Sequence, residues 1–180
     1  MSQTCQETSD CTGHGWVGGG DPLVYQYGTT FTTGNPIIGE TISQITYNIK
    51  KDSGTTSTDK IYMMYKNAAG TVTTVSTTTY VINDLPTSFG GAGALKSFAF
   101  NNITVGSGDR FIVYQDGVTS ASQKWGICES ATIEFTGNTT GRLQDGSWSA
   151  TNGSTDYCFT TGTVPPTDDT ILLPPPVAWI

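Results

Sequence analysis

The sequence predicts an all-β fold, a single antiparallel β-sandwich of the jelly-roll type with an extended arm at each end. Short apolar segments alternate with clusters of Gly, Asn, Asp and Ser along most of the chain, at the spacing typical of sandwich strands. No window shows the 3.6-residue period of an amphipathic helix. The chain of 180 residues, 36% of them hydrophobic, is long enough for one domain with its own core.

The clearest strand is predicted at residues 42–51, where Ile45, Tyr47 and Ile49 alternate with polar side chains. The run at residues 61–65 is apolar on both faces, which predicts a central strand. Further strands are predicted, in chain order, at residues 71–75, 79–82, 98–105, 110–114, 125–128, 131–135 and 156–160. The sandwich should therefore have about eight to ten strands.

The two ends of the chain differ from this pattern. Residues 1–22 are poor in apolar side chains and predict an N-terminal arm with Trp16 as its one anchor, so the sandwich domain is expected at residues 23–162. Residues 163–180 form a proline-interrupted tail that is unusually apolar for a terminal segment. The apolar residues of the tail are Ile171, Leu172, Leu173, Val177, Trp179 and Ile180.

A backbone stiffened by proline holds these apolar side chains away from the local chain, so they need a groove on this domain or on a neighbour. The tail therefore predicts a docking arm that works by strand or anchor exchange. On this basis we expect a non-enzymatic structural subunit displayed on a virion, fibre or cell surface. Its expected partners are copies of itself or other surface subunits.

Charged residues make up only 13% of the chain, and Thr, Ser, Gly and Asn take their place. Such surfaces are typical of extracellular and virion proteins, so we expect an extracellular, virion or cell-surface location. The net charge of −7 and the isoelectric point near 4.4 argue against nucleic acid as a partner, because phosphate binding needs clustered Lys and Arg. No stretch reaches the ~20 apolar residues of a membrane-spanning helix, and residues 1–20 lack the apolar core of a signal peptide, so we expect no membrane insertion.

The four cysteines fit two disulfide bonds. Cys5 and Cys11 lie close together in the N-terminal arm, whereas Cys128 and Cys158 lie in apolar segments far apart in the sequence. Four cysteines allow three pairings, and local closure of the first loop favours Cys5 with Cys11 and Cys128 with Cys158. A zinc site is the competing interpretation, but its usual Cys-x-x-Cys pairs and clustered histidines are missing.

Three Asn-x-Ser/Thr triplets, at Asn102, Asn138 and Asn152, are expected N-glycan acceptors if the protein meets a glycosylation system. In that case they should lie in surface loops or at strand edges. A chain so rich in Asn, Thr and Ser also generates such triplets by chance.

Three groups of residues carry a resemblance to a known kind of module. They are the segment at 39–47 (GETISQITY), the phenylalanine strand, turn and apolar strand at 98–114, and an Asp-Gly-x-Trp turn at 145–148 followed by Asp-x-x-Phe at 156–159. Their order resembles the jelly-roll modules of the carbohydrate-binding and choice-of-anchor kind on bacterial surface proteins and phage fibres. The resemblance implies a carbohydrate-binding module or adhesin as the alternative function.

Non-catalytic sugar sites use exposed aromatic rings, on which a sugar ring stacks, together with amide and carboxylate groups that bind its hydroxyls. Core packing is the alternative role for each aromatic residue in a sandwich. The candidate glycan-binding residues are Tyr114, Gln115, Asp116, Trp125, Trp148, Asn152 and Tyr157.

Neither a catalytic centre nor a cofactor is expected, apart from a structural calcium ion that the resemblance allows, with Asp109 and Asp156 as oxygen donors. His14 is the only histidine, which argues against Ser-His-Asp and Cys-His nucleophiles. A small polysaccharide-degrading enzyme is the remote alternative. Its best acidic pair is Glu129 and Glu134, whose odd spacing places them on opposite faces of a strand.

Overall fold

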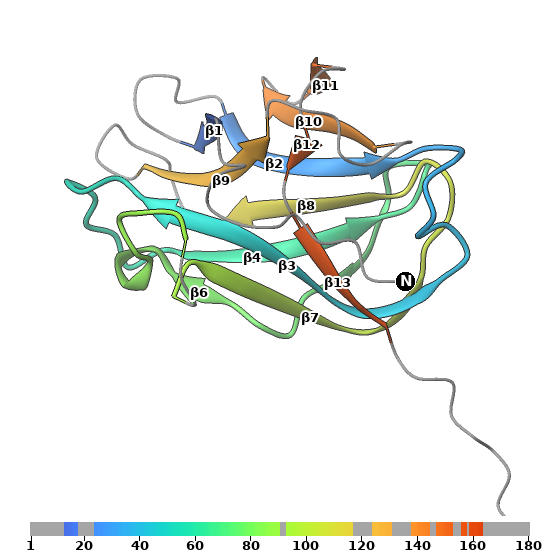
Figure 1. Ribbon diagram of the computed structural model, residues 1–180, viewed down its shortest axis with the longest axis horizontal. Helices are drawn as coiled ribbons and strands as arrows, with labels where there is room; N and C mark the ends of the chain where they lie inside the picture. The colour runs from blue at the N-terminus through green and yellow to red at the C-terminus, as the bar shows by residue number, and fades with distance from the viewer. Residues whose placement is uncertain are drawn as a thin grey trace, which may run out of the picture.

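The computed structural model describes residues 13–17, 24–90, 93–116, 124–130, 138–144, 147–152, 156–157 and 159–163. These residues form thirteen β-strands and one short 3-10 turn, and the strands pair into two antiparallel sheets that lie face to face (Figure 1). The predicted all-β sandwich is therefore confirmed, while its jelly-roll topology stays a prediction.

The first sheet lies nearer the viewer in Figure 1 and is organised around strand β3. In order it contains β1 (Gly13–Val17), β9 (Trp125–Ser130), β3 (Thr41–Lys51) and β13 (Phe159–Thr163), with β12 (Asp156–Tyr157) paired to β9 and β7 (Leu95–Thr104) paired to β3. The second sheet contains β11 (Ser147–Asn152), β10 (Asn138–Gln144), β2 (Val24–Phe31), β8 (Arg110–Gln115), β4 (Lys60–Lys66) and β5 (Val72–Val75), with β6 (Tyr80–Val81) paired to β4. The 3-10 turn, Ile82–Asp84, follows β6.

Strand β3 confirms the alternation that the sequence shows. Ile45, Tyr47 and Ile49 are fully buried, and the polar residues between them face outward. Along β3 the buried residues are two positions apart, except between Ile42 and Ile45, which are three apart. The pairing of β3 with β7 shifts register at this point. Strand β3 pairs with β7 along one edge, and β13 and β9 follow one another along its other edge.

The core is the apolar layer between the two sheets. Phe111 lies at the centre of an aromatic group, with ring centroids 5.6 Å from Phe31, 5.7 Å from Phe100 and 5.2 Å from Tyr65. Burying one large apolar side chain contributes about 1.5–3 kcal/mol. The aliphatic residues of this core include Ile37, Ile42, Ile45, Ile49, Ile61, Met63, Ile82, Leu85, Ile103, Val105, Val113 and Ile127.

Polar side chains also cross the interior, and hydrogen bonds join several of them. The hydroxyls of Thr29 and Tyr47 lie 3.1 Å apart and join the two sheets. The indole N–H of Trp125 donates to Gln115 Oε1 (2.8 Å), and Gln115 Nε2 donates to Asp59 Oδ2 (3.1 Å). A buried polar group without a partner is costly, so these contacts fix how the sheets face each other.

Neutral hydroxyl pairs link β3 to β7 on the outer face of the first sheet. The hydroxyls of Thr41 and Thr104 lie 3.0 Å apart, and those of Thr46 and Ser97 lie 2.6 Å apart.

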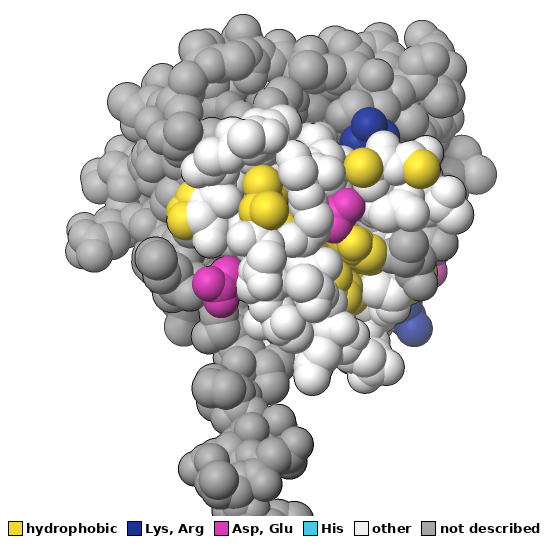
Figure 2. Space-filling model, turned by 90° about the vertical axis from the view of Figure 1, so that its right-hand side faces the viewer, with side chains coloured by type: hydrophobic (Ala, Val, Ile, Leu, Met, Phe, Trp, Pro, Cys, Tyr) yellow, Lys and Arg dark blue, Asp and Glu magenta, His cyan; other side chains and the backbone are white. Residues whose placement is uncertain are grey.

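At the end of the molecule seen in Figure 2, the charged side chains of the described residues are few and stand apart from one another. The low charge expected from composition is visible on this face.

Four strands were not predicted from the sequence. Strand β1 lies within the predicted N-terminal arm, where it pairs with β9, so this part of the arm adds a strand to the first sheet. Strand β2 contains Gly28, where an added Cβ would come within 2.3 Å of the Phe111 carbonyl oxygen. Strands β10 and β11 are dominated by Ser, Thr, Asn and Gly, which give no apolar alternation.

Two predicted strands need correction, and a third is not described. The strand expected at residues 79–82 is shorter, because the chain leaves β6 into the 3-10 turn at Ile82. The strand expected at 156–160 is divided into β12, which pairs with β9, and β13, which pairs with β3. The strand predicted at 131–135 lies outside the described residues.

Replacing Gln115 with Leu should lower the free energy of unfolding by about 1–3 kcal/mol, because the buried indole N–H of Trp125 loses its acceptor while the volume is kept. The measurement is urea unfolding followed by tryptophan fluorescence. Gln44→Leu is the matched control, because Gln44 is exposed on β3, and its effect should stay within about 0.5 kcal/mol. Equal effects of the two variants would contradict the role given to Gln115.

Candidate functional site

Two of the predicted glycan-binding residues belong to the core. Trp125 is fully buried, and Gln115 is 1% exposed. Their side chains are bonded to each other, so neither is available to stack on a sugar or to bind its hydroxyls. For these two residues the core-packing role, which the sequence left open, is the one the structure supports.

Tyr114 and Asp116 lie on the outer face of the second sheet, where they meet a residue that sequence reasoning missed. The ring of Tyr114 packs against that of Tyr62 on β4, with centroids 4.9 Å apart and planes inclined by 57°. Asp116 Oδ1 accepts a hydrogen bond from the backbone N–H of Lys60. We call Tyr62, Tyr114 and Asp116 the tyrosine face. Both rings are partly exposed and Asp116 is exposed.

The pairing of the strands places Trp148 in the same row of residues as Tyr114, with the buried Gln26 between them. Tyr114 is paired with Gln26 on β2, and Gln26 is paired with Leu143 on β10. Leu143 in turn is paired with Trp148 on β11. Directly paired residues share one face of a sheet, so Trp148 occupies a register position in the same row as Tyr114.

The remaining glycan candidates lie apart from this row. Asn152 ends β11, where it is paired with Thr140. Tyr157 belongs to the first sheet, where it is paired with Glu129. The structure therefore brings Tyr114 and Asp116 together with Tyr62, while Trp148 lies three strands away in the same row, beyond the buried Gln26.

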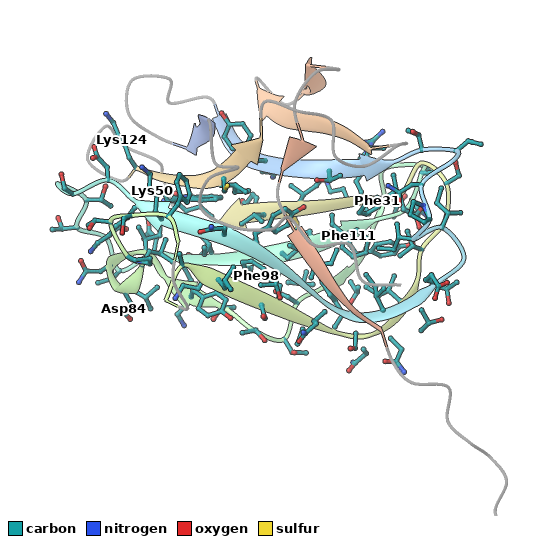
Figure 3. All side chains as sticks on the ribbon, viewed as in Figure 1. Phe31, Lys50, Asp84, Phe98, Phe111 and Lys124 are labelled. Carbon is teal, nitrogen blue, oxygen red and sulfur yellow. The ribbon has the colours of Figure 1, made fainter. Side chains whose placement is uncertain are left out.

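A second feature is an open hollow of about 360 Å³ beside the start of β4. Among the described residues it is lined by five with polar side chains, Thr56, Ser57, Thr58, Asp59 and Asn83. It lies next to Asp84, at the end of the sandwich opposite the contact between Phe31 and Phe111 (Figure 3). We call it the polar hollow.

The walls of the polar hollow are held by hydrogen bonds to the rest of the fold. The backbone N–H of Asn83 donates to the Ser57 carbonyl (3.0 Å), and the N–H of Ile82 donates to the Asp59 carbonyl (2.9 Å). The Lys51 amine donates to the carbonyl and the side-chain oxygen of Asn83. Asp59 supplies the one carboxylate among the described residues that line the hollow.

The carboxylate of Asp109, one of the two calcium candidates, already accepts hydrogen bonds that hold the turn before β8. Its Oδ2 accepts the Tyr65 hydroxyl (2.6 Å) and the backbone N–H of Gly106 (2.6 Å), and the residue is 5% exposed. Asp156 is the first residue of β12, and only its backbone position is described. Within the described ranges no group of three His, Cys, Asp or Glu residues is placed to hold a metal ion.

Cys128 is disulfide-bonded and lies on β9, directly before Glu129. The other three cysteines, Cys5, Cys11 and Cys158, lie outside the described residues, so the pairing with Cys158 stays a prediction. Of the acceptor asparagines, Asn102 is exposed on β7, while Asn138 and Asn152 are described only as backbone positions in β10 and β11.

Several other candidates fall outside the described residues. Among them are Glu134 of the acidic pair and the apolar residues of the tail, which are Ile171, Leu172, Leu173, Val177, Trp179 and Ile180. The described ranges contain no helix with the length and apolar character that a membrane crossing requires.

Comparison with known proteins adds no relative to this picture. No family model matches the chain, and neither the curated proteins nor the solved structures include a match.

Burial raises the pKa of Tyr62 to about 12, and the charges of Tyr114 and Asp116 act in the same direction. Burial also raises the pKa of Tyr65 to about 12, together with its hydrogen bond to Asp109. A raised tyrosine pKa means that the folded state holds the proton more tightly than the unfolded state, whose pKa is 10.0. The stability that these tyrosines contribute is therefore complete below pH 10 and is lost between pH 10 and about 12.

The double variant Tyr62→Phe/Tyr65→Phe should accordingly lose less stability over this interval than the wild type does. The check is a series of urea unfolding curves between pH 9 and pH 12, roughly the interval in which phenols titrate. Lysine titration is common to both proteins and cancels in the comparison. Parallel pH profiles would show that these two tyrosines do not carry the effect.

Proposed function

We propose that this chain is a non-enzymatic β-sandwich subunit displayed on the outside of a virion, fibre or cell, where it assembles through its terminal arms. The observation that carries the proposal is strand β13. Among the described residues, β13 pairs on one side only, with β3, and its last residue, Thr163, leads directly into the apolar tail. An edge strand with unpaired backbone groups can receive a strand from a neighbouring chain.

The surface and the interior support the same class of function. The hydrogen bonds between β3 and β7 side chains are neutral, as expected for a domain with few charged residues. The hydrogen-bonded chain from Trp125 to Asp59 and the turn held by Asp109 serve the fold. A rigid sandwich with an edge strand next to an apolar tail is suited to joining copies.

Deleting residues 174–180 should leave a folded domain but weaken assembly, because Val177, Trp179 and Ile180 supply apolar anchors of about 1.5–3 kcal/mol each. Light scattering over a concentration series should show larger species for the full chain and a mass nearer to one chain for the deletion. The full-length chain has a mass of 19.1 kDa. Circular dichroism checks that the shortened protein remains folded.

A full-length variant with Val177, Trp179 and Ile180 changed to Ser is the matched control for chain length. It should behave like the deletion, because apolar burial drives the docking. Oligomers of unchanged size in both variants would remove the proposal.

The second candidate function is glycan binding, and the tyrosine face is the observation that favours it. Two partly exposed aromatic rings lie side by side next to the carboxylate of Asp116, and Trp148 occupies a position in the same row. Aromatic rings offer a stacking surface for a sugar ring, and the carboxylate offers an acceptor for its hydroxyls. The resemblance to carbohydrate-binding modules points to the same class of ligand.

Tyr62→Ala and Tyr114→Ala should each weaken binding to a responsive polysaccharide by about tenfold, because each removes part of the stacking surface. The measurement is a glycan array followed by titration of the polysaccharide that responds. Phe89→Ala is the matched control, since Phe89 is an aromatic residue that lies under the Lys50 amine, away from the tyrosine face. An array without a response, or equal losses in all three variants, would count against this candidate.

A further inference from the structure

Strand β7 is another edge strand of the first sheet, besides β13 and β1. Among the described residues it pairs with β3 along one side only, and it begins with Leu95, whose side chain is 54% exposed. It carries a single charged side chain, that of Lys96. A ten-residue edge with so little charge is a ready template for another strand.

The free side of β7 is nevertheless occupied at Ser97 by one side chain. The hydroxyl of Tyr80 accepts a hydrogen bond from the backbone N–H of Ser97 (3.0 Å) and donates one to the backbone carbonyl of the same residue (2.8 Å). One phenol thus satisfies both backbone groups that an incoming strand would use at this position.

The next outward-facing position, Ala99, is occupied in the same way. The backbone N–H of Thr77 donates to the Ala99 carbonyl (2.8 Å). The N–H of Ala99 donates to the hydroxyl of Thr78 (3.4 Å). Two successive edge positions are therefore covered by residues 77–80, which lie between β5 and β7 in the chain.

Tyr80 is held firmly in this role. It belongs to β6, at the edge of the second sheet, so its side chain spans the open side of the sandwich. Its ring packs edge-on against Phe98, with centroids 5.4 Å apart and planes at 89°, and the Lys96 amine lies 5.0 Å from its centroid. The hydroxyl is thereby fixed against the β7 backbone.

We infer that residues 77–80, with the Tyr80 hydroxyl as the central contact, occupy the β7 edge in place of a partner strand and close it to a second copy of this chain. Without this contact, the exposed β7 edges of two copies would pair antiparallel about a two-fold axis. The inference narrows the choice of edge for the proposed assembly, because the strands of the first sheet that then still pair on one side only, among the described residues, are β13, β1 and the two-residue β12. Only this consequence for assembly rests on the proposed function; the closing of the β7 edge does not.

The test is the full-length variant Tyr80→Phe, which keeps the ring and removes the hydroxyl. Amide hydrogen exchange of Ser97 should become about tenfold or more faster, because its N–H has lost the partner seen here. The weight-average mass from light scattering should rise to about twice the wild-type value at high concentration. Tyr62→Phe is the matched control, because it removes a phenol hydroxyl that does not touch the β7 edge, and its mass should equal that of the wild type.

Adding Ala99→Lys to Tyr80→Phe should return the mass to the wild-type value, because a lysine on an edge strand opposes strand addition. If Tyr80→Phe does not fold, Thr78→Val takes its place, since it frees the Ala99 amide alone. A folded variant with faster exchange at the freed amide but an unchanged mass would overturn the inference. All of these proteins carry the tail, so failure of the tail-deletion experiment would leave this comparison intact.

Discussion

Strand β3 is the element on which the rest of the structure depends. It hydrogen-bonds to β7 on one edge and to β13 and β9 on the other, and β9 in turn holds β1 and β12. Its inward residues Ile45, Tyr47 and Ile49 are fully buried, and the Tyr47 hydroxyl reaches Thr29 in the opposite sheet. A slip of one residue in β3 would turn this whole set toward solvent, so the register of one strand sets both the first sheet and its contact with the second.

The carboxylates of the described core region are held by neutral donors. Asp109 stands just before β8 and accepts hydrogen bonds from Tyr65 and Gly106. At the other end of β8, Gln115 donates to Asp59 and accepts from Trp125. A single strand is thus tied at both ends to its surroundings, and its buried middle, with Phe111 and Val113, fills the space between the sheets.

The sequence predicts strands where burial of one face imposes an alternation of apolar and polar residues. It does not predict the strands that lack this alternation. Strands β3 and β8 could be predicted because their inward residues are apolar, whereas β10 and β11 consist largely of small polar residues. Trp125 was a reasonable exposed candidate, since an aromatic residue carries no sign of the face on which it lies. Only the fold shows that its indole N–H meets Gln115.

The same limit explains what was missed at the surface. Tyr62 lies between the buried residues Ile61 and Met63, so it looked like part of a central strand that is buried on both faces. Tyr80 looked like an ordinary strand residue, because its role depends on Ser97, which is distant in sequence and belongs to the other sheet. Contacts between edges of different sheets leave no local pattern in a sequence.

The neutral hydroxyl pairs between β3 and β7 also determine how the domain responds to its medium. Dissolved ions screen exposed charges over a Debye length of about 8 Å at physiological ionic strength, but they leave contacts between uncharged hydroxyls almost untouched. Thr41 with Thr104 and Thr46 with Ser97 therefore hold these strands together equally well in dilute and in concentrated salt. A domain joined in this way can move between media of very different salinity without loosening its first sheet.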